Sequence, residues 1–380
     1  MGKGNYSMSQ ISVKTTNLTE RQVFLDYLRV VACLMVVVIH STEPYYIGEG
    51  GRCQVASAAD AFWVTVFETI CRACVPLFVM TSAYLLFPVT RPTGEFFRRR
   101  LLRVGLPYML WCGYYSLVYG SPLSRVLFNF PDAGGHLWFV PMLLGLYIAM
   151  PLLSPWAERV SERELRGWIW AWLATTLLPF VRKLSLVLFG EPSFGAVPYL
   201  WGEAPWNRFG SFYYLGGFIG YMLLGLYFRR FARTLSWGET LRRALPLLSV
   251  GFVGMAFGFY CRFGGKFPYD APYARVVEVE LVLEYCSTFV ALAVIGWFMV
   301  FRKFSGTGWL YRRIVLPLSQ ASYGTYLVHM TILLTLLPHV KSNLPTPVAV
   351  VALALVTFVC ASFVSLIGRR LPRVGASFFG

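Results

Sequence analysis

Apolar runs long enough to cross a bilayer recur along the whole chain, and they restrict what it can fold into. A spanning helix needs about 20 apolar residues, and a window of that length finds about ten such runs. They lie near residues 24–42, 60–88, 104–120, 136–156, 167–189, 211–228, 244–261, 281–301, 314–337 and 347–367. With 57% hydrophobic and only 14% charged residues, the chain lacks the polar cover of a water-facing globule. We therefore predict an all-α integral membrane protein, a bundle of about ten transmembrane helices.

Loops between these runs are short, so the chain is predicted to hold one membrane domain, at residues 22–370. Residues 1–21 are polar and have no small-residue cleavage site, which indicates a tail and not a signal peptide. Residues 371–380 form a second short tail. Substrates are therefore expected to bind within the helix bundle or at its loops.

The distribution of basic residues orients the bundle. If the N-terminus lies in the cytoplasm, the tails and loops on that side carry 23 Lys and Arg, against 7 in the opposite loops. Positive residues concentrate in cytoplasmic loops of membrane proteins. The asymmetry predicts that both termini are cytoplasmic, and it accounts for the net charge of +16 without a nucleic-acid partner.

The first apolar run contains ionisable residues, which are costly in a membrane and therefore functional candidates. Arg29 and His40 are eleven positions apart. In a helix this spacing returns to within about 20° of the same face and rises about 16 Å. Arg29 is thus expected near the cytoplasmic surface and His40 toward the outer leaflet, with Asp26 one turn before Arg29 as an ion-pair partner. The alternatives are a snorkelling anchor for Arg29 and a hydrogen-bonded packing role for His40.

The other three histidines, His136, His329 and His339, also fall in the predicted outer half. His329 lies as deep in its own run as His40 does in the first one. No pair has the i,i+4 spacing of a zinc motif and no acidic ligand accompanies them, so no metal site is predicted.

Two further pairs carry charge at helical spacing. Glu68 and Arg72 are four apart in the second run, where they either brace the bundle or contact substrate. Glu280 and Glu284 are four apart at the outer start of the eighth run, and Glu284 could orient a histidine or contact a sugar hydroxyl.

Arg100 and Arg103 lie on one helix face at the cytoplasmic surface, before Pro107. The guanidinium fork suits phosphates, although a basic cluster here is also what the topology alone would produce. Walker, GxSxG and Rossmann glycine patterns are absent from the sequence, which argues against ATP-driven, serine-hydrolase and dinucleotide chemistry.

Taken in order over residues 22–370, these motifs resemble acyltransferase family 3, bacterial membrane proteins that O-acylate cell-surface glycans. The motifs that carry the resemblance are Asp26-x-x-Arg29 with His40, Val75-Pro76-Leu77-Phe78 with Ser82-Ala83-Tyr84, Arg100-x-x-Arg103, His136-Leu-Trp138-Phe139-Val-Pro141, and Ser322-Tyr323-Gly324-Thr-Tyr326-Leu-Val-His329. Without an appended soluble domain, the chain is most similar to stand-alone acetyltransferases such as the one acting on enterobacterial common antigen. It departs from the family in having Ser82-Ala83 in place of Ser-Gly, which predicts a looser helix approach there, and in a Pro107 that follows Arg103 by four residues.

The resemblance implies an O-acetyltransferase of the bacterial inner membrane that uses acyl-CoA, most simply acetyl-CoA, as co-substrate. It implies that His40 is the catalytic base, that Arg29 binds or positions the donor, and that Arg100 and Arg103 hold the donor phosphates. His40 could instead carry the acyl group transiently. We predict acceptor-side or supporting roles for Asp26, Glu68, Arg72, His136, Trp138, Glu284, Ser322, Tyr323 and His329.

The implied acceptor is an exopolysaccharide or lipid-linked glycan at the outer side of the membrane. Two other hypotheses stay open from the sequence, namely a glycan exporter or flippase and a non-catalytic subunit of an envelope polysaccharide assembly system. The sequence also leaves open whether the chain forms a homo-oligomer or joins an envelope polysaccharide synthase complex, and whether Cys53 and Cys261 pair in the outer loops.

Overall fold

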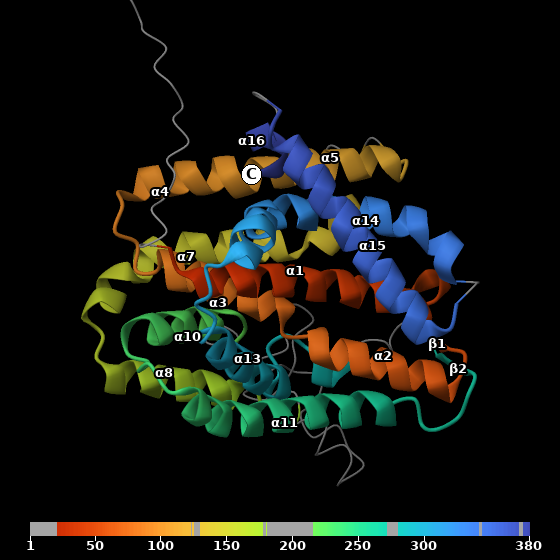
Figure 1. The fold of residues 1–380 in the computed structure, drawn as a ribbon, viewed down its shortest axis with the longest axis horizontal. Helices are drawn as coiled ribbons and strands as arrows, with labels where there is room; N and C mark the ends of the chain where they lie inside the picture. Colours follow the sequence, from red (N-terminus) through yellow and green to blue (C-terminus); the bar gives the residue numbers. More distant parts are fainter. Residues whose placement is uncertain are drawn as a thin grey trace, which may run out of the picture.

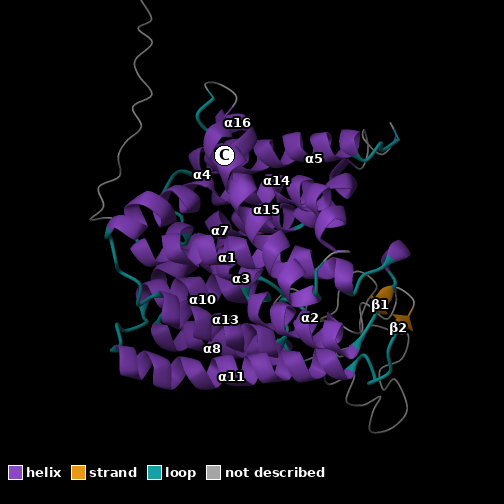
Figure 2. Ribbon diagram, turned by 45° about the vertical axis from the view of Figure 1, so that its right-hand side comes forward, coloured by secondary structure: helices purple, strands orange, loops and turns teal. Residues whose placement is uncertain are grey.

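The structure is a computed structural model that describes residues 21–122, 124, 130–177, 180, 216–271, 280–341, 344–371 and 375–380. These residues form a helix bundle with one pair of short strands at one end (Figures 1 and 2). The residues Pro179, Arg182 and Lys183, which interrupt the fifth predicted run, lie outside the described residues.

The helices are α1 (Val23–Thr42), α2 (Ala58–Cys71), α3 (Cys74–Leu86), α4 (Thr93–Arg100), α5 (Leu106–Val118), α7 (Phe139–Arg159), α8 (Glu162–Thr175), α10 (Ile219–Arg230), α11 (Trp237–Cys261), α13 (Thr288–Phe301), α14 (Leu316–Lys341), α15 (Thr346–Gly368) and α16 (Gly375–Phe379). Short 3-10 turns are η1 (Glu43–Tyr45), η2 (Glu49–Gly51), η4 (Phe130–Leu137) and η6 (Glu280–Leu283). Two segments, η3 (Leu101–Gly105) and η7 (Tyr311–Val315), are π-helical.

Five helices of the described chain are long and apolar enough to cross a membrane. They are Val23–Tyr45, Ala58–Leu86, Gly134–Arg159, Trp237–Cys261 and Thr346–Gly368. The predicted all-α membrane class is thus confirmed. The number of about ten spans and the orientation of the termini stay predictions, because several other predicted runs hold helices too short to meet the same criterion, such as α13 with 14 residues.

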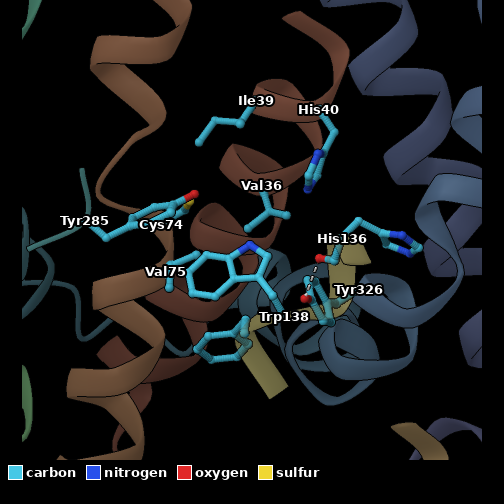
Figure 3. A pocket seen from close by; sticks show the side chains of 10 residues that line it. Val36, Ile39, His40, Cys74, Val75, His136, Trp138, Tyr285 and Tyr326 are labelled. Carbon is cyan, nitrogen blue, oxygen red and sulfur yellow. Dashed lines mark hydrogen bonds between the residues drawn. The ribbon is translucent and has the colours of Figure 1, made fainter. Parts of the chain in front are cut away.

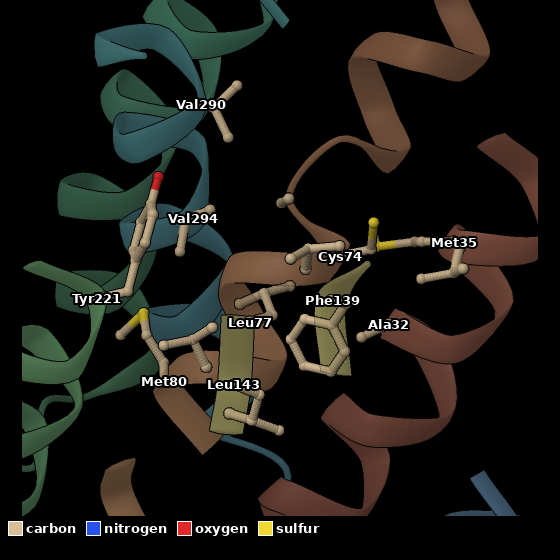
Figure 4. Packing of buried hydrophobic residues seen from close by; sticks show 14 of the residues in the cluster. Ala32, Met35, Cys74, Leu77, Met80, Phe139, Leu143, Tyr221, Val290 and Val294 are labelled. Atoms are coloured by element: carbon tan, nitrogen blue, oxygen red, sulfur yellow. The ribbon is translucent and has the colours of Figure 1, made fainter. Parts of the chain in front are cut away.

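α1 occupies the centre of the bundle and contacts α2, α3, α13, α14 and α15 (Figure 1). Apolar residues around most of its circumference are buried, which explains why a helix with three ionisable residues still packs as a core element. Figure 4 shows part of this core, in which Ala32 of α1 lies toward the ring of Phe139 of α7.

The second predicted run is a broken helix. α2 ends at Cys71 and α3 begins at Cys74, with a turn at Arg72 and Ala73 between them. The break has a local cause, because Pro76 has no amide hydrogen to donate to the carbonyl of Arg72, four residues earlier. The interruption separates the two halves of the predicted run at Arg72 and Ala73.

The strands join two loops that were both predicted on the outer side. β1 (Cys53–Val55) pairs antiparallel with β2 (Tyr269–Ala271), in a register that sets Cys53 opposite Ala271 (Figure 2). Cys53 is buried and Cys261 is exposed, and no disulfide joins these two described residues.

Candidate functional site

A pocket surrounds His40 where α1, α3, α7 and α14 meet η4 and the segment before α13. It is a small pocket, partly open to the outside, with about 250 Å³ of space that includes open solvent. Its walls are Val36, Ile39, His40, Cys74, Val75, His136, Trp138, Phe139, Tyr285 and Tyr326 (Figure 3). Apolar walls with a few convergent polar groups are typical of small-molecule sites.

His40 is held at the end of α1 by a carboxylate. Its Nδ1 lies 2.9 Å from Oε2 of Glu43, three residues later, where α1 passes into η1. The side chain of His40 is 13% exposed and that of Glu43 is 32% exposed. Sequence reasoning missed Glu43 because the apolar run ends at residue 42, although the i,i+3 spacing of His40 and Glu43 was a readable signal.

Two more histidines stand beside His40. The ring centroids of His40 and His329 are 5.1 Å apart, and those of His329 and His136 are 5.8 Å apart. The proximity of His40 and His329 agrees with their equal predicted depth. His329 is fully buried, and its Nδ1 donates to the carbonyl of Tyr326 at 2.5 Å. The Nε2 atoms of His329 and His136 are buried and have no hydrogen-bond partner among the described residues.

These histidines do not form a metal centre. Among the described residues, no three His, Cys, Asp or Glu side chains are arranged to hold a metal ion. The three rings pack through faces and edges, and the ring of Tyr115 lies edge-on to His136 with centroids 4.5 Å apart.

Two aromatic residues close one side of the pocket. The rings of Trp138 and Tyr285 lie with centroids 5.3 Å apart, and Trp138 is 38% exposed. Behind them, the guanidinium of Arg72 lies 4.7 Å from the centroid of the Tyr285 ring. Trp138, for which we predict an acceptor-side or supporting role, therefore lines the pocket.

Glu68 and Arg72 form the expected i,i+4 ion pair, with Nη1 and Oε2 at 3.1 Å. Glu68 also accepts a hydrogen bond from Thr42 of α1, and Arg72 Nε donates to the carbonyl of Leu283 at 2.6 Å. The pair therefore ties α2 to α1 and to the segment before α13. These contacts favour the first of the two alternatives, in which the pair braces the bundle. The guanidinium of Arg72 lies directly behind Tyr285 of the pocket wall.

Glu284 stands next to Tyr285 but is not among the residues that line the pocket. Its backbone carbonyl accepts a hydrogen bond from the amide of Ser287 at 2.8 Å, at the N-cap of α13.

Asp26 is the hub of a buried network at the opposite end of α1. It accepts two hydrogen bonds from Arg21 at 2.6 and 2.7 Å, one from Tyr311 at 2.7 Å and one from Ser319 at 2.6 Å. Arg29 lies farther away, with Nη1 4.0 Å from Oδ1 of Asp26. The expected Asp26–Arg29 pair is therefore present but secondary, because Arg21 is the main partner of the carboxylate.

Arg29 keeps donor capacity that the described protein does not use. Its remaining electrostatic neighbours are Arg21, Tyr147 and Arg100, and none of them is a carboxylate. Arg29 is not among the pocket-lining residues, and Ala32 packs beside Phe139 between the two ends of α1 (Figure 4). Arg29 thus marks one end of α1, called here the cationic end, and His40 marks the other, called the pocket end. The packed layer of Ala32 and Phe139 lies between them.

Arg100 and Arg103 lie near this cationic end. Arg100 ends α4, and its guanidinium lies 5.8 Å from the ring centroids of both Phe96 and Tyr147. Arg103 is exposed within the π-helical η3. Its positive charge repels that of Arg369, which follows the end of α15.

Ser322 and Tyr323 serve the packing of α14. The hydroxyl of Ser322 donates to the carbonyl of Ser319 at 2.9 Å, within the same helix. The hydroxyl of Tyr323 donates to the carbonyl of Val104 at 2.6 Å and so ties α14 to η3. Neither residue lines the pocket.

Comparison with known proteins adds one finding. A family model described as an acyltransferase domain matches residues 22–366 of the 380-residue chain. No curated protein and no solved structure matches the chain.

Proposed function

The chain belongs to acyltransferase family 3, and on that premise we propose that it transfers an acetyl group from cytoplasmic acetyl-CoA to a hydroxyl of an exopolysaccharide or lipid-linked glycan. We place the acceptor at the outer side of the bacterial inner membrane. One observation carries the proposal: His40 lines a mostly apolar pocket at one end of α1, while Arg29, 4.0 Å from Asp26, lies toward the other end.

The transfer step uses His40 as general base. The acceptor hydroxyl gives its proton to the imidazole as its oxygen attacks the thioester carbonyl carbon, so that a C–O bond forms and the C–S bond breaks. The sulfur leaves with the bonding electron pair and takes the proton from the imidazole. Proton transfer by a positioned side chain of this kind contributes about 10² to 10⁴ in rate.

The donor is held from the cytoplasmic end. Arg100 and Arg103 bind its phosphates, and Arg29 attracts the donor along the face of α1. A distance of about 16 Å along the helix separates Arg29 from His40, which the extended arm of the donor covers. Donor binding must part the packed layer at Ala32 and Phe139 for the thioester to reach the pocket.

The test is labelled acetyl transfer in membranes, with wild type and His40→Ala at equal abundance. We measure both label in the envelope glycan and release of free CoA thiol. The variant is expected to lose transfer by at least about 100-fold. His339→Ala is the matched control, because this exposed histidine lies in the same outer half but not in the pocket, and we expect it to keep wild-type transfer.

The competing functions give different results in this assay. Glycan binding and translocation without any thiol release would indicate an exporter or flippase. Full transfer by His40→Ala would remove the assigned role of the imidazole. Tolerance of alanine at both His40 and Arg29 would indicate a non-catalytic subunit. Acetyl label retained on the protein and lost with His40→Ala would assign the acyl-carrier route instead of the base.

A further inference from the structure

Glu43 is an acidic residue at a helix position that disfavours negative charge. It is the C-cap residue of α1, and its amide bonds to the carbonyl of Ile39. The C-terminal end of a helix carries partial negative charge, so an acidic residue there is unfavourable unless a cationic or hydrogen-bonding partner compensates. In the described part of the chain, the ion-pair partner of Glu43 is His40.

The backbone at Glu43 is fixed by a hydrogen-bonded turn. The carbonyl of Glu43 accepts hydrogen bonds from the amides of Tyr46 at 3.1 Å and Ile47 at 2.7 Å. Pro44 follows directly and restricts the turn. The turn therefore fixes the position of the Glu43 backbone relative to His40, within reach of the 2.9 Å side-chain contact.

The contact determines which nitrogen of His40 works as the base. An ionised carboxylate only accepts hydrogen bonds, so the proton of the neutral imidazole resides on Nδ1 and the lone pair on Nε2. The same carboxylate stabilises the imidazolium that forms when Nε2 takes the proton from an acceptor hydroxyl. His329 provides the contrast, because its Nδ1 bonds to a neutral backbone carbonyl.

We propose that Glu43 is the positioning residue of the transferase, which fixes the tautomer of His40 and stabilises its protonated form during transfer. This inference rests on the proposed function, in which His40 is the general base. Glu43 acts through His40 and exchanges no proton with substrate. The proton moves only between the acceptor hydroxyl, Nε2 of His40 and the departing sulfur.

The test is steady-state kinetics of Glu43→Gln in detergent-purified full-length protein. Loss of the orienting carboxylate in another histidine-based site costs about 10⁴ in kcat, and because Glu43 is partly exposed we expect a smaller fall, about 100-fold. The KM values for acetyl-CoA and acceptor should change by less than about twofold, since Glu43 acts on the transition state and not on binding. Glu49→Gln is the matched control, an exposed glutamate in the same outer loop with the same change of charge, and it should keep wild-type kcat.

A double variant separates this inference from the proposed function. If Glu43 acts through His40, Glu43→Gln adds no further loss in the His40→Ala background. Independent, multiplied losses would overturn the positioning role, and so would a wild-type kcat in Glu43→Gln when His40→Ala is inactive. Full activity of His40→Ala would instead mark failure of the proposed function itself.

A spectroscopic measurement covers the case in which Glu43→Gln does not fold. Imidazole ¹⁵N chemical shifts of wild-type protein, assigned by comparison with His40→Ala, report which ring nitrogen carries the proton. We expect neutral His40 to carry it on Nδ1. A neutral ring protonated on Nε2 in the wild type would overturn the inference without any variant of Glu43.

Discussion

At the scale of single residues, the two arginines near Asp26 have separable tasks. Arg21 makes two short hydrogen bonds to the buried carboxylate, whereas Arg29 lies 4.0 Å from it. Breaking a buried charge pair costs about 3–5 kcal/mol, and partial exposure of Arg21 reduces that figure. We therefore expect stability to depend on Arg21, whereas Arg29 is the arginine that the proposed function assigns to donor binding.

We predict opposite results for the two arginine variants. Arg29→Gln should raise the KM for acetyl-CoA by about 10-fold, the loss of one charge-assisted hydrogen bond, with little change in melting temperature. Arg21→Gln should lower the melting temperature while leaving that KM near its wild-type value. Equal loss of stability in both variants, with an unchanged KM in Arg29→Gln, would show that Arg29 is a structural residue.

At the scale of helices, the departure of Ser82-Ala83 from the family pattern has a structural counterpart in α10. Sequence reasoning predicted a looser approach at Ala83, where the family usually has glycine. The helix that packs there supplies the glycine itself, because a Cβ built on Gly225 would lie 2.8 Å from Cβ of Ala83 and 2.8 Å from the carbonyl oxygen of Met80. α3 and α10 are therefore in close contact, and the expected looseness is not observed.

Gly225→Ala is predicted to destabilise the bundle by overpacking, by about 1–3 kcal/mol. Adding Ala83→Gly should recover only part of this loss, because the backbone oxygen of Met80 still obstructs the new methyl group. Thermal unfolding in detergent measures both effects. Gly145→Ala in α7 is the control, since a Cβ added there would meet nothing within 4 Å and alanine favours helix. Equal melting temperatures for Gly225→Ala and wild type would contradict the close contact.

At the scale of the whole molecule, hydropathy predicted the helical class, and spacing placed Arg29 and His40 toward opposite ends of the first helix. These features depend on periodicity along one helix, which a single sequence displays. The partners of Asp26 could not be predicted in this way, because Tyr311 and Ser319 lie 285 and 293 residues away in the chain. Contacts at such separation depend on how helices assemble, and neither residue has a local pattern that marks it.

The other features that could not be predicted from the sequence lie at the ends of helices. Hydropathy places Glu43 in a loop because the apolar run ends one residue earlier, yet this side chain completes the geometry of His40. The break between α2 and α3 was missed because both halves are apolar, although Pro76 was a signal for it. Positions within helices could therefore be assigned to a face from the sequence, whereas positions at helix ends, such as Glu43, could not.

The proposed reaction depends on how the molecule is oriented in the membrane. Cys261 ends α11 in an exposed position, at a loop predicted to be outside, whereas Cys360 is exposed in the middle of α15 and is expected to face lipid. A charged maleimide added to spheroplasts should therefore label wild type but not Cys261→Ser, because thiols react as thiolates in water and the six other cysteines are buried. Labelling of Cys261 only after the membrane is permeabilised would invert the topology. His40 would then face the cytoplasm and Arg29 the outside, and a cytoplasmic thioester could not enter from the end of α1 that carries the arginines.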